Sequence, residues 1–320
     1  MMRSELDAAG ISDPRLRDAY RACRDINARN GRTFFLATRL LAPAQRPAVH
    51  ALYGFAREAD DILDDLNPCL DTAIRAKRLE LLADRFRAGG GHWDDPVLAA
   101  VTHTARRYAI PSDLFDDFLR SMRMDLTVTD YPDRVALNRY MRGSAEVIGL
   151  QLLPVLGTVG PAEAAAPYAA ALGKAFQLTN FLRDVDEDLT RQRVYLPADE
   201  LAAYGVDRDL LTWCHVNHRT EARVRRALAA QHAITRGVYR FACAGVELLA
   251  PRSRPCVATA LTLYSEILDR IEDSDFAVFS RRATVGTTRR LQVAGAGLFR
   301  AWLARNGHPA GSGDPTIGAA

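Results

Sequence analysis

Residues 49–65 read VHALYGFAREADDILDD, and an apolar stripe and an acidic stripe coincide on this segment. The apolar stripe consists of Val49, Leu52, Tyr53, Ala56, Ala59, Ile62 and Leu63. On a helix, residues four apart lie roughly 40° from each other around the axis, so Asp60 and Asp64 would share one face. Like charges at this spacing destabilise a helix by roughly 0.2–0.5 kcal/mol per pair, and Asp is a poor helix former. The segment therefore predicts a packed helix that also carries an acidic face.

A second acidic segment, residues 180–188, reads NFLRDVDED and repeats the spacing. Asp184 and Asp188 would share a helical face, with Asn180 one turn earlier and Gln177 on the adjoining part of the helix. Mg²⁺ takes oxygen ligands and binds through one or two carboxylates plus substrate phosphates. Zinc is disfavoured, because no Cys or His lies near either segment in sequence. Each cluster alone could be a solvated acidic face, but two such clusters favour a site for Mg²⁺ and a diphosphate.

The overall charge argues against nucleic acid as a partner. The 320 residues include 42 Lys+Arg and 39 Asp+Glu, a net charge of only +3, and 48% are hydrophobic, which is ample for a buried core. Charge is nevertheless clustered, with acid at 58–65 and 184–188. Basic residues gather at Arg281, Arg282, Arg289 and Arg290. This separation suggests an anionic ligand met by metal ions on one side and by arginine on the other.

The chain as a whole predicts an all-α fold. Strand signals are nearly absent, and apolar residues recur at helical spacing between Pro and Gly breaks. The helices are expected at 13–29, 44–66, 70–88, 94–108, 112–127, 134–158, 162–187, 216–247, 252–273 and 284–305, with short turns near 198–203 and 207–213. No low-complexity linker interrupts 13–305, so we expect a single domain there. Residues 1–12 would be an N-terminal extension and the Gly/Pro-rich residues 306–320 a disordered tail.

Localisation follows from what the sequence lacks. The five cysteines are scattered and odd in number, which favours free thiols in a reducing compartment. We find no signal peptide and no run of roughly 20 apolar residues. We therefore expect a cytoplasmic protein that at most rests on the inner face of the membrane.

Several segments resemble the squalene/phytoene synthase family, and within it most of all the bacterial phytoene-forming branch. They occur in order and at normal spacing over about residues 20–300. The matching segments are 30–41, 46–61, 140–149, 175–188, 193–197 and 264–269. The resemblance implies a class I isoprenoid synthase fold, a helical bundle around a central cavity.

The resemblance also implies a prenyltransferase reaction. Two geranylgeranyl diphosphates would be joined head to head (1′–1) through a cyclopropyl diphosphate to phytoene, releasing pyrophosphate, in carotenoid biosynthesis. NADPH is not expected for that product. The nearest alternative condenses two farnesyl diphosphates to squalene, dehydrosqualene or hydroxysqualene. Two less favoured hypotheses are a non-catalytic helical scaffold and an ordinary terpene cyclase. Downstream carotenoid enzymes could be partners, and the hydrophobic product suggests a peripheral membrane contact.

The family's site residues can be carried onto this chain position by position. Mg²⁺, for which Mn²⁺ could substitute, would be held by Asp60, Asp64, Asn180, Asp184 and Asp188. The substrate would be bound by Arg32, Thr33, Arg57, Ser144, Ile148, Gln177, Asn180, Arg183, Tyr264 and Arg281. Tyr140 would lie near the reacting carbons, where its ring could stabilise a cation by roughly 0.5–2 kcal/mol or its hydroxyl could assist proton loss. A core tyrosine with a satisfied hydroxyl is the alternative.

The sequence departs from the family pattern at two places. The phosphate-loop segment reads Asn30-Gly31-Arg32, where a His-Ser pair commonly precedes the basic residue, so Asn30 and Gly31 are doubtful ligands. Asp186 replaces the usual Gly inside the second acidic cluster. Asp125 also fits a family pattern, and we expect it to play a structural, hydrogen-bonding role.

Overall fold

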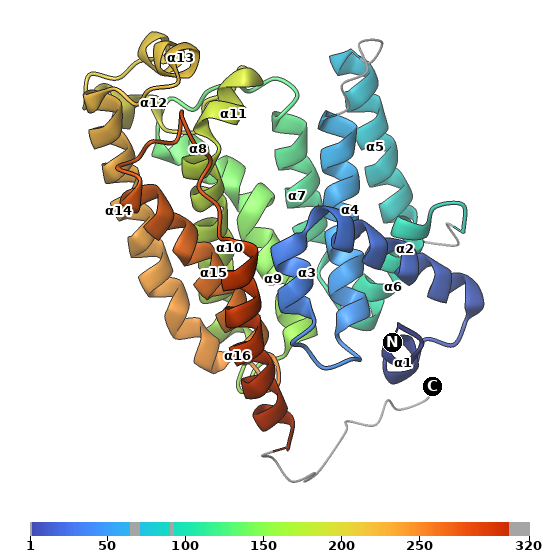
Figure 1. Cartoon of the computed structure of the whole chain (residues 1–320). Helices are drawn as coiled ribbons and strands as arrows, with labels where there is room; N and C mark the ends of the chain where they lie inside the picture. The colour runs from blue at the N-terminus through green and yellow to red at the C-terminus, as the bar shows by residue number, and fades with distance from the viewer. Residues whose placement is uncertain (1, 65–70, 90–92, 307–320) are drawn as a thin grey trace.

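The computed structural model describes residues 2–64, 71–89 and 93–306. Within these ranges the chain forms helices packed side by side (Figure 1), and its β structure is limited to the isolated bridges Asp130–Val194 and Thr158–Leu249. The helices are α1 (Met2–Ala8), α2 (Pro14–Asn30), α3 (Arg32–Thr38), α4 (Arg46–Asp64), α5 (Thr72–Ala88), α6 (Pro96–Arg107), α7 (Ser112–Met124), α8 (Arg134–Met141), the π-helical turn η1 (Arg142–Glu146), α9 (Val147–Leu156), α10 (Ala162–Arg183), α11 (Val185–Thr190), α12 (Ala198–Ala202), α13 (Arg208–Asn217), α14 (Ala222–Cys243), the 3₁₀ turn η2 (Ala244–Leu248), α15 (Arg254–Asp273) and α16 (Thr287–Asn306). The predicted all-α class is confirmed.

Two predicted helices are interrupted where the site residues lie. The helix expected at 134–158 contains the π-helical turn η1, and π-helical turns inside α-helices are frequent at functional sites. The helix expected at 162–187 breaks at Asp184 into α10 and α11. Periodicity does not reveal either break, because the apolar pattern continues through both.

Two short helices were not predicted, α1 and α3. Residues 2–8, placed in an extension by the sequence, form α1, whose Leu6 is fully buried and whose Glu5 accepts a hydrogen bond from Arg46 at 2.7 Å. The tail 307–320 lies outside the described residues. Helix α3 follows α2 directly after Gly31, so the sequence shows no loop between them.

Aspartates begin several helices. Asp71, Asp95, Asp133 and Asp207 each accept a hydrogen bond from the backbone N–H three residues later, at 2.7–3.1 Å. Such N-caps each contribute about 1 kcal/mol. These four aspartates therefore set helix boundaries rather than bind a ligand.

Helix α10 runs through the middle of the bundle, between α9 and η1 on one side and α14 and α15 on the other (Figure 1). Glycines permit the closest approaches. A Cβ at Gly149 would lie 2.1 Å from the carbonyl oxygen of Ala169, and one at Gly173 would lie 2.2 Å from that of Ala145. These contacts hold the helix that carries Tyr140, Ser144 and Ile148 against the helix that leads to the second acidic cluster.

The largest two buried apolar clusters divide the bundle along the chain. One is built mainly by α2, α4, α6 and α7, around Phe55 and Phe115, and the other by α10, α13, α14 and α15, around Leu228 and Leu268. Each acidic cluster therefore stands on a different packed half of the molecule. Among the described residues, no helix is both long and apolar enough to cross a bilayer.

Candidate active site

The first acidic cluster lies on the last two turns of α4. Asp60 is half-buried, whereas Asp61 is exposed and forms an ion pair with Arg57 one turn earlier. Asp64 is the last residue of α4, and its side chain lies outside the described part of the chain. Because α4 continues unbroken to its end, the predicted i,i+4 relation of Asp60 and Asp64 holds for the backbone.

The second acidic cluster lies at the break between α10 and α11. Asp184 has φ −105° and ψ 14°, outside the helical region, yet helical hydrogen bonds continue through it. The N–H of Asp184 donates to the carbonyl of Asn180, and the N–H of Asp188 donates to the carbonyl of Asp184, both at 2.8 Å. The four-residue spacing of Asn180, Asp184 and Asp188 thus survives the break.

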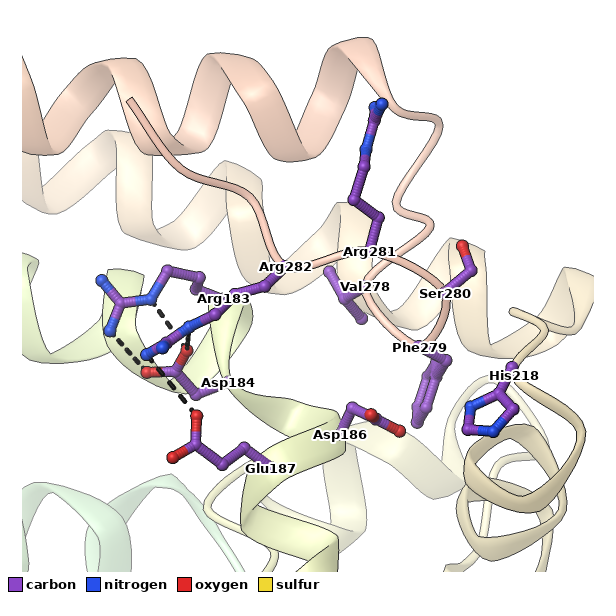
Figure 2. A pocket seen from close by; sticks show the side chains of 10 residues that line it. All are labelled: Arg183, Asp184, Asp186, Glu187, His218, Val278, Phe279, Ser280, Arg281 and Arg282. Atoms are coloured by element: carbon purple, nitrogen blue, oxygen red, sulfur yellow. Dashed lines mark hydrogen bonds and ion pairs between the residues drawn. The ribbon is translucent and has the colours of Figure 1, made fainter. Parts of the chain in front are cut away.

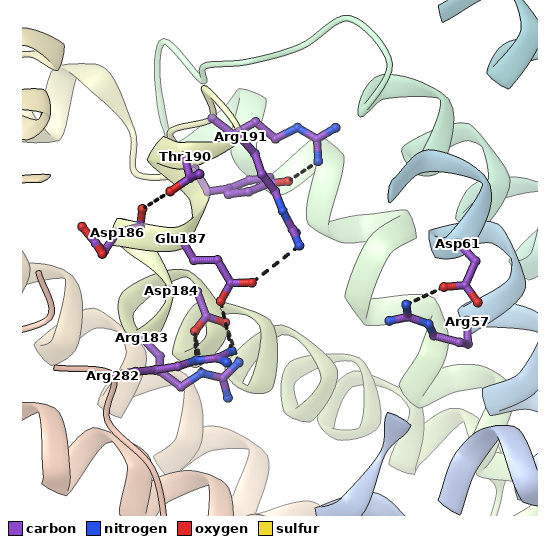
Figure 3. A network of polar contacts seen from close by, with 11 residues as sticks. Arg57, Asp61, Arg183, Asp184, Asp186, Glu187, Thr190, Arg191 and Arg282 are labelled. Atoms are coloured by element: carbon purple, nitrogen blue, oxygen red, sulfur yellow. Dashed lines mark hydrogen bonds and ion pairs between the residues drawn. The ribbon is translucent and has the colours of Figure 1, made fainter. Parts of the chain in front are cut away.

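Arginines hold both oxygens of Asp184 (Figures 2 and 3). Arg183 donates from Nε to Oδ1 at 2.8 Å and from Nη2 to Oδ2 at 2.5 Å, and Arg282 donates from Nε to Oδ1 at 2.8 Å. Burial by itself opposes ionisation, but the two guanidinium groups outweigh it and lower the pKa of Asp184. This carboxylate is therefore ionised at neutral pH.

Asp188 has the opposite environment. Within the described residues its carboxylate has no side-chain hydrogen bond or ion pair. Burial and the negative charge of Asp184 raise the pKa of Asp188 to about 7. Asp184 is thus ionised, and its charge is balanced by two arginines. Asp188 has a pKa near 7, and a bound cation would favour its ionised form.

Two buried oxygen atoms without a hydrogen-bond partner among the described residues lie on α10 and η1. Asn180 donates from Nδ2 to Gln177 at 3.4 Å, but its buried Oδ1 has no hydrogen-bond partner among the described residues. The same is true of the buried hydroxyl of Ser144 on η1. A buried polar atom without a partner is unfavourable by about 1–3 kcal/mol, so both oxygens are free to accept a hydrogen bond from, or to ligate, a bound molecule or ion. Ile148 is half-buried one turn after Ser144.

These oxygens fit a hard cation in donor type. The described residues contain no group of three or more His, Cys, Asp or Glu side chains already arranged around one point. Mg²⁺ does not require such a group, because it keeps several waters and shares its coordination with substrate phosphates. Asp60, Asn180, Asp184 and Asp188 supply oxygen donors, with Asn180 Oδ1 open to a new partner.

Tyr140 is buried within an aromatic group. Its hydroxyl donates to Oδ2 of Asp125 at 2.7 Å, and Tyr195 donates to Oδ1 of the same carboxylate at 3.2 Å. Burial and the charge of Asp125 raise the pKa of Tyr140 well above its ordinary value. The hydroxyl is thus satisfied and neutral, which favours an action of Tyr140 through its ring. Asp125 has the hydrogen-bonding role expected from the sequence.

A second aromatic group lines the space beside Arg183. The ring of Tyr264 on α15 stacks on Phe176 at 4.3 Å and lies 5.2 Å from Phe34. Burial raises the pKa of Tyr264 to about 12, although the nearby Arg183 opposes the rise. Tyr264 therefore presents a neutral hydroxyl next to a guanidinium group.

Of the four predicted arginines, only Arg183 contacts a carboxylate of the second cluster among the described residues. Arg32 is exposed at the start of α3, where Thr33 follows it half-buried. Arg281 lines a pocket of about 270 Å³ with Asp184 and Glu187, but its side chain points away from both acids (Figure 2). Arg282, which sequence reasoning did not assign, reaches them instead. The run of neighbouring arginines was the available signal, but it could not say which one faces the acids.

The structure accounts for the residues that depart from the family pattern, Asn30, Gly31 and Asp186. A Cβ at Gly31 would lie 2.7 Å from the ring of Tyr53, so close packing accounts for glycine there, and the side chain of Asn30 bonds its own helix. Asp186 forms a 2.7 Å hydrogen bond with Nδ1 of His215 on α13. Asp186 therefore ties α11 to α13.

Comparison with known proteins gives a consistent result. A sequence model of the squalene/phytoene synthase family matches residues 27–289. The chain is 35% identical over 297 residues to a phytoene synthase of Arthrospira platensis, covering 89% of this chain and 94% of that one. It is 34% identical over 298 residues to a 15-cis-phytoene synthase of Synechococcus elongatus, with the same coverage.

Solved structures show the same fold. The chain is similar to a dehydrosqualene synthase crystallised with a ligand, with a TM-score of 0.78 and 25% identity over 91% of this chain and 98% of that one. A squalene synthase of Alicyclobacillus acidocaldarius gives a TM-score of 0.74 at 23% identity, over 84% of this chain and 98% of that one.

Proposed function

Because the chain belongs to the squalene/phytoene synthase family and is a prenyltransferase, we propose that it joins two geranylgeranyl diphosphates head to head. The product would be phytoene, formed through a cyclopropyl diphosphate, with release of pyrophosphate. The observation that carries this proposal is the 35% identity to a phytoene synthase over 89% of the chain. The intact acidic clusters argue against a non-catalytic scaffold.

The charges of the site support the departure of a diphosphate. Arg57 lies on α4, and Arg183 and Arg282 lie beside α11, on opposite sides of the network (Figure 3). Guanidinium groups bind phosphate oxygens in a fork and are always charged. A diphosphate between these elements would meet positive charge from both halves of the bundle.

Mg²⁺ would be held by Asp60, Asp64, Asn180, Asp184 and Asp188, and when bound it would act as a Lewis acid toward the leaving diphosphate. Asn180 would contribute its unpartnered Oδ1, and Asp188 would ionise as the cation is ligated. Arg183 would keep Asp184 ionised throughout.

The hydrocarbon part of the site would be formed by η1, α9 and α10. Tyr140, held by Asp125, and the rings of Phe34, Phe176 and Tyr264 provide π faces toward which an allylic cation is attracted. Ser144 and Ile148 would line the path of a prenyl chain. NADPH is not needed for phytoene.

A second candidate uses two farnesyl diphosphates and gives a C30 product. The likeness to a dehydrosqualene synthase structure, at a TM-score of 0.78, favours it. The two candidates share the departure of the diphosphates and differ in the length of the hydrocarbon chains. They also differ in reductant where the C30 product is squalene, because squalene formation consumes NADPH.

A competition assay separates them. Purified protein with Mg²⁺ would be given equal concentrations of geranylgeranyl and farnesyl diphosphate, and product masses would be read by mass spectrometry. We expect a C40 hydrocarbon without added NADPH. A predominantly C30 product would support the second candidate, and no condensation product from either substrate would refute both.

A further inference from the structure

The loop between α15 and α16 is anchored at both ends and exposed in the middle. Phe279 is 2% exposed, and beyond the arginines Ala283 and Val285 are 7% and 5% exposed. Between these anchors, Ser280, Arg281 and Arg282 are exposed. The backbone of the loop is thus fixed by buried side chains, while the arginine side chains can reorient without unfolding it.

Arg282 and Arg183 grip Asp184 differently. The side chain of Arg183 is 17% exposed and makes two hydrogen bonds to the carboxylate from the adjacent position in sequence. Arg282 is 53% exposed, makes one hydrogen bond to Oδ1, and lies 3.6 Å from Glu187. Ion pairs of exposed side chains contribute little to stability, so Arg282 is the partner that Asp184 releases more easily.

A metal ligated by Asp184 would compete with Arg282 for the same carboxylate. Oδ1 of Asp184 accepts hydrogen bonds from both Arg183 and Arg282, and Oδ2 accepts one from Arg183. A divalent cation at Oδ1 would repel the Arg282 guanidinium directly. The freed side chain would remain beside the pocket, where its planar fork suits a phosphate group.

We propose that Arg282 is a displaceable cation that pairs with Asp184 until a divalent metal binds there and then turns to the diphosphate. This inference rests on the proposed function, since it assumes that Asp184 is a metal ligand. One side chain then links two binding events. It opposes binding of the metal alone and favours binding of the metal together with a diphosphate, so that the two ligands bind cooperatively.

The test measures binding rather than turnover, on the full-length protein. Calorimetry would follow Mn²⁺ binding without substrate, and then inorganic pyrophosphate binding at saturating Mg²⁺. We expect Arg282→Gln to tighten Mn²⁺ binding by about fivefold, because its competitor is gone. The same variant should weaken pyrophosphate binding by about tenfold or more, because a charged donor is lost.

Arg281→Gln is the matched control, because it removes the same charge from the next residue, whose side chain points away from Asp184 (Figure 2). Its Mn²⁺ affinity should stay within about twofold of the wild type, which separates contact from long-range charge. If Mn²⁺ binding is unchanged or weaker in Arg282→Gln, or equally tightened in both variants, the inference is wrong while the proposed metal site stands. If the wild type binds no Mn²⁺ and Asp184→Asn binds alike, the metal site itself fails.

Discussion

The two Asp-x-x-x-Asp clusters look alike in sequence but are built differently in the structure. Asp60 and Asp64 lie on an unbroken helix, where Arg57 pairs with the exposed Asp61. Asp184, by contrast, sits at a helix break, and two arginines hold both its oxygens. The first cluster is a helix face beside an exposed ion pair. In the second cluster, two arginines balance the charge of Asp184, and the neighbouring Asp188 has a pKa of about 7. The comparison shows that i,i+4 spacing identifies candidate carboxylate ligands but does not predict whether each one is ionised.

Loss of a carboxylate from either cluster should have the largest effect. Asp60→Asn and Asp184→Asn should each reduce turnover by about three orders of magnitude or more, because each would weaken the metal's hold on the leaving diphosphate. Pyrophosphate release measures the effect, and circular dichroism checks the fold. Near-normal turnover in only one variant would show that the two clusters do not contribute equally to the reaction.

Removal of an arginine should distinguish the clusters by stability. Arg183→Gln leaves the 15%-exposed carboxylate of Asp184 with only Arg282, so we expect a loss of about 2–3 kcal/mol in the free energy of unfolding. Arg57→Gln breaks a pair with a 58%-exposed Asp61, so we expect about 0.5 kcal/mol. Urea unfolding of both variants would measure the difference. Equal losses would show that Asp184 is not held more strongly than Asp61.

The two acidic regions should also differ in how they change the free energy of unfolding with pH. Burial and the nearby Asp95 raise the pKa of Glu58 on α4 to about 7. The folded state then binds a proton that the unfolded state has released between about pH 4.5 and 7, so this residue lowers stability as pH rises through that window. Glu58→Gln should stabilise the protein by about 1–3 kcal/mol at pH 8 and by little at pH 4.5.

Asp184 has the opposite sign, because its pKa is lowered. Its contribution to stability is present above the ordinary range of aspartate pKa values and disappears as pH falls below that range.

Thermal unfolding of the wild type and of Glu58→Gln at pH 4.5 and pH 8 tests the prediction for Glu58. A Glu58→Gln variant that is less stable than the wild type at pH 8 would contradict the raised pKa.

Asp186→Ala should have only a small effect on stability and on turnover. The side chain forms a hydrogen bond with His215 and is not one of the proposed metal ligands, so we expect a loss of about 0.5–1 kcal/mol in stability. Turnover should stay within about threefold of the wild type. A large loss of turnover with normal stability would instead place Asp186 in the active site.

The sequence by itself determined the fold class and the family of this protein and named the candidate site residues. Helical periodicity gave the all-α class, and the four-residue spacing picked out Asp60, Asp184 and Asp188 with Asn180, because a helix repeats closely enough at four residues to place such side chains on one face. The resemblance of ordered segments gave the family. Helical periodicity and residue spacing are properties of short segments, so they can be read from the sequence without the tertiary structure.

Only the tertiary structure decided how those residues are used. The partnership of Asp184 with Arg282 joins residues from distant parts of the chain, as does that of Asp125 with Tyr195. Which of two adjacent arginines faces the acids depends on how Phe279 and Ala283 anchor a loop, and the pKa of Asp188 depends on burial by surrounding helices. Charge state and contact arise from packing across the bundle, and no periodicity along the chain encodes them.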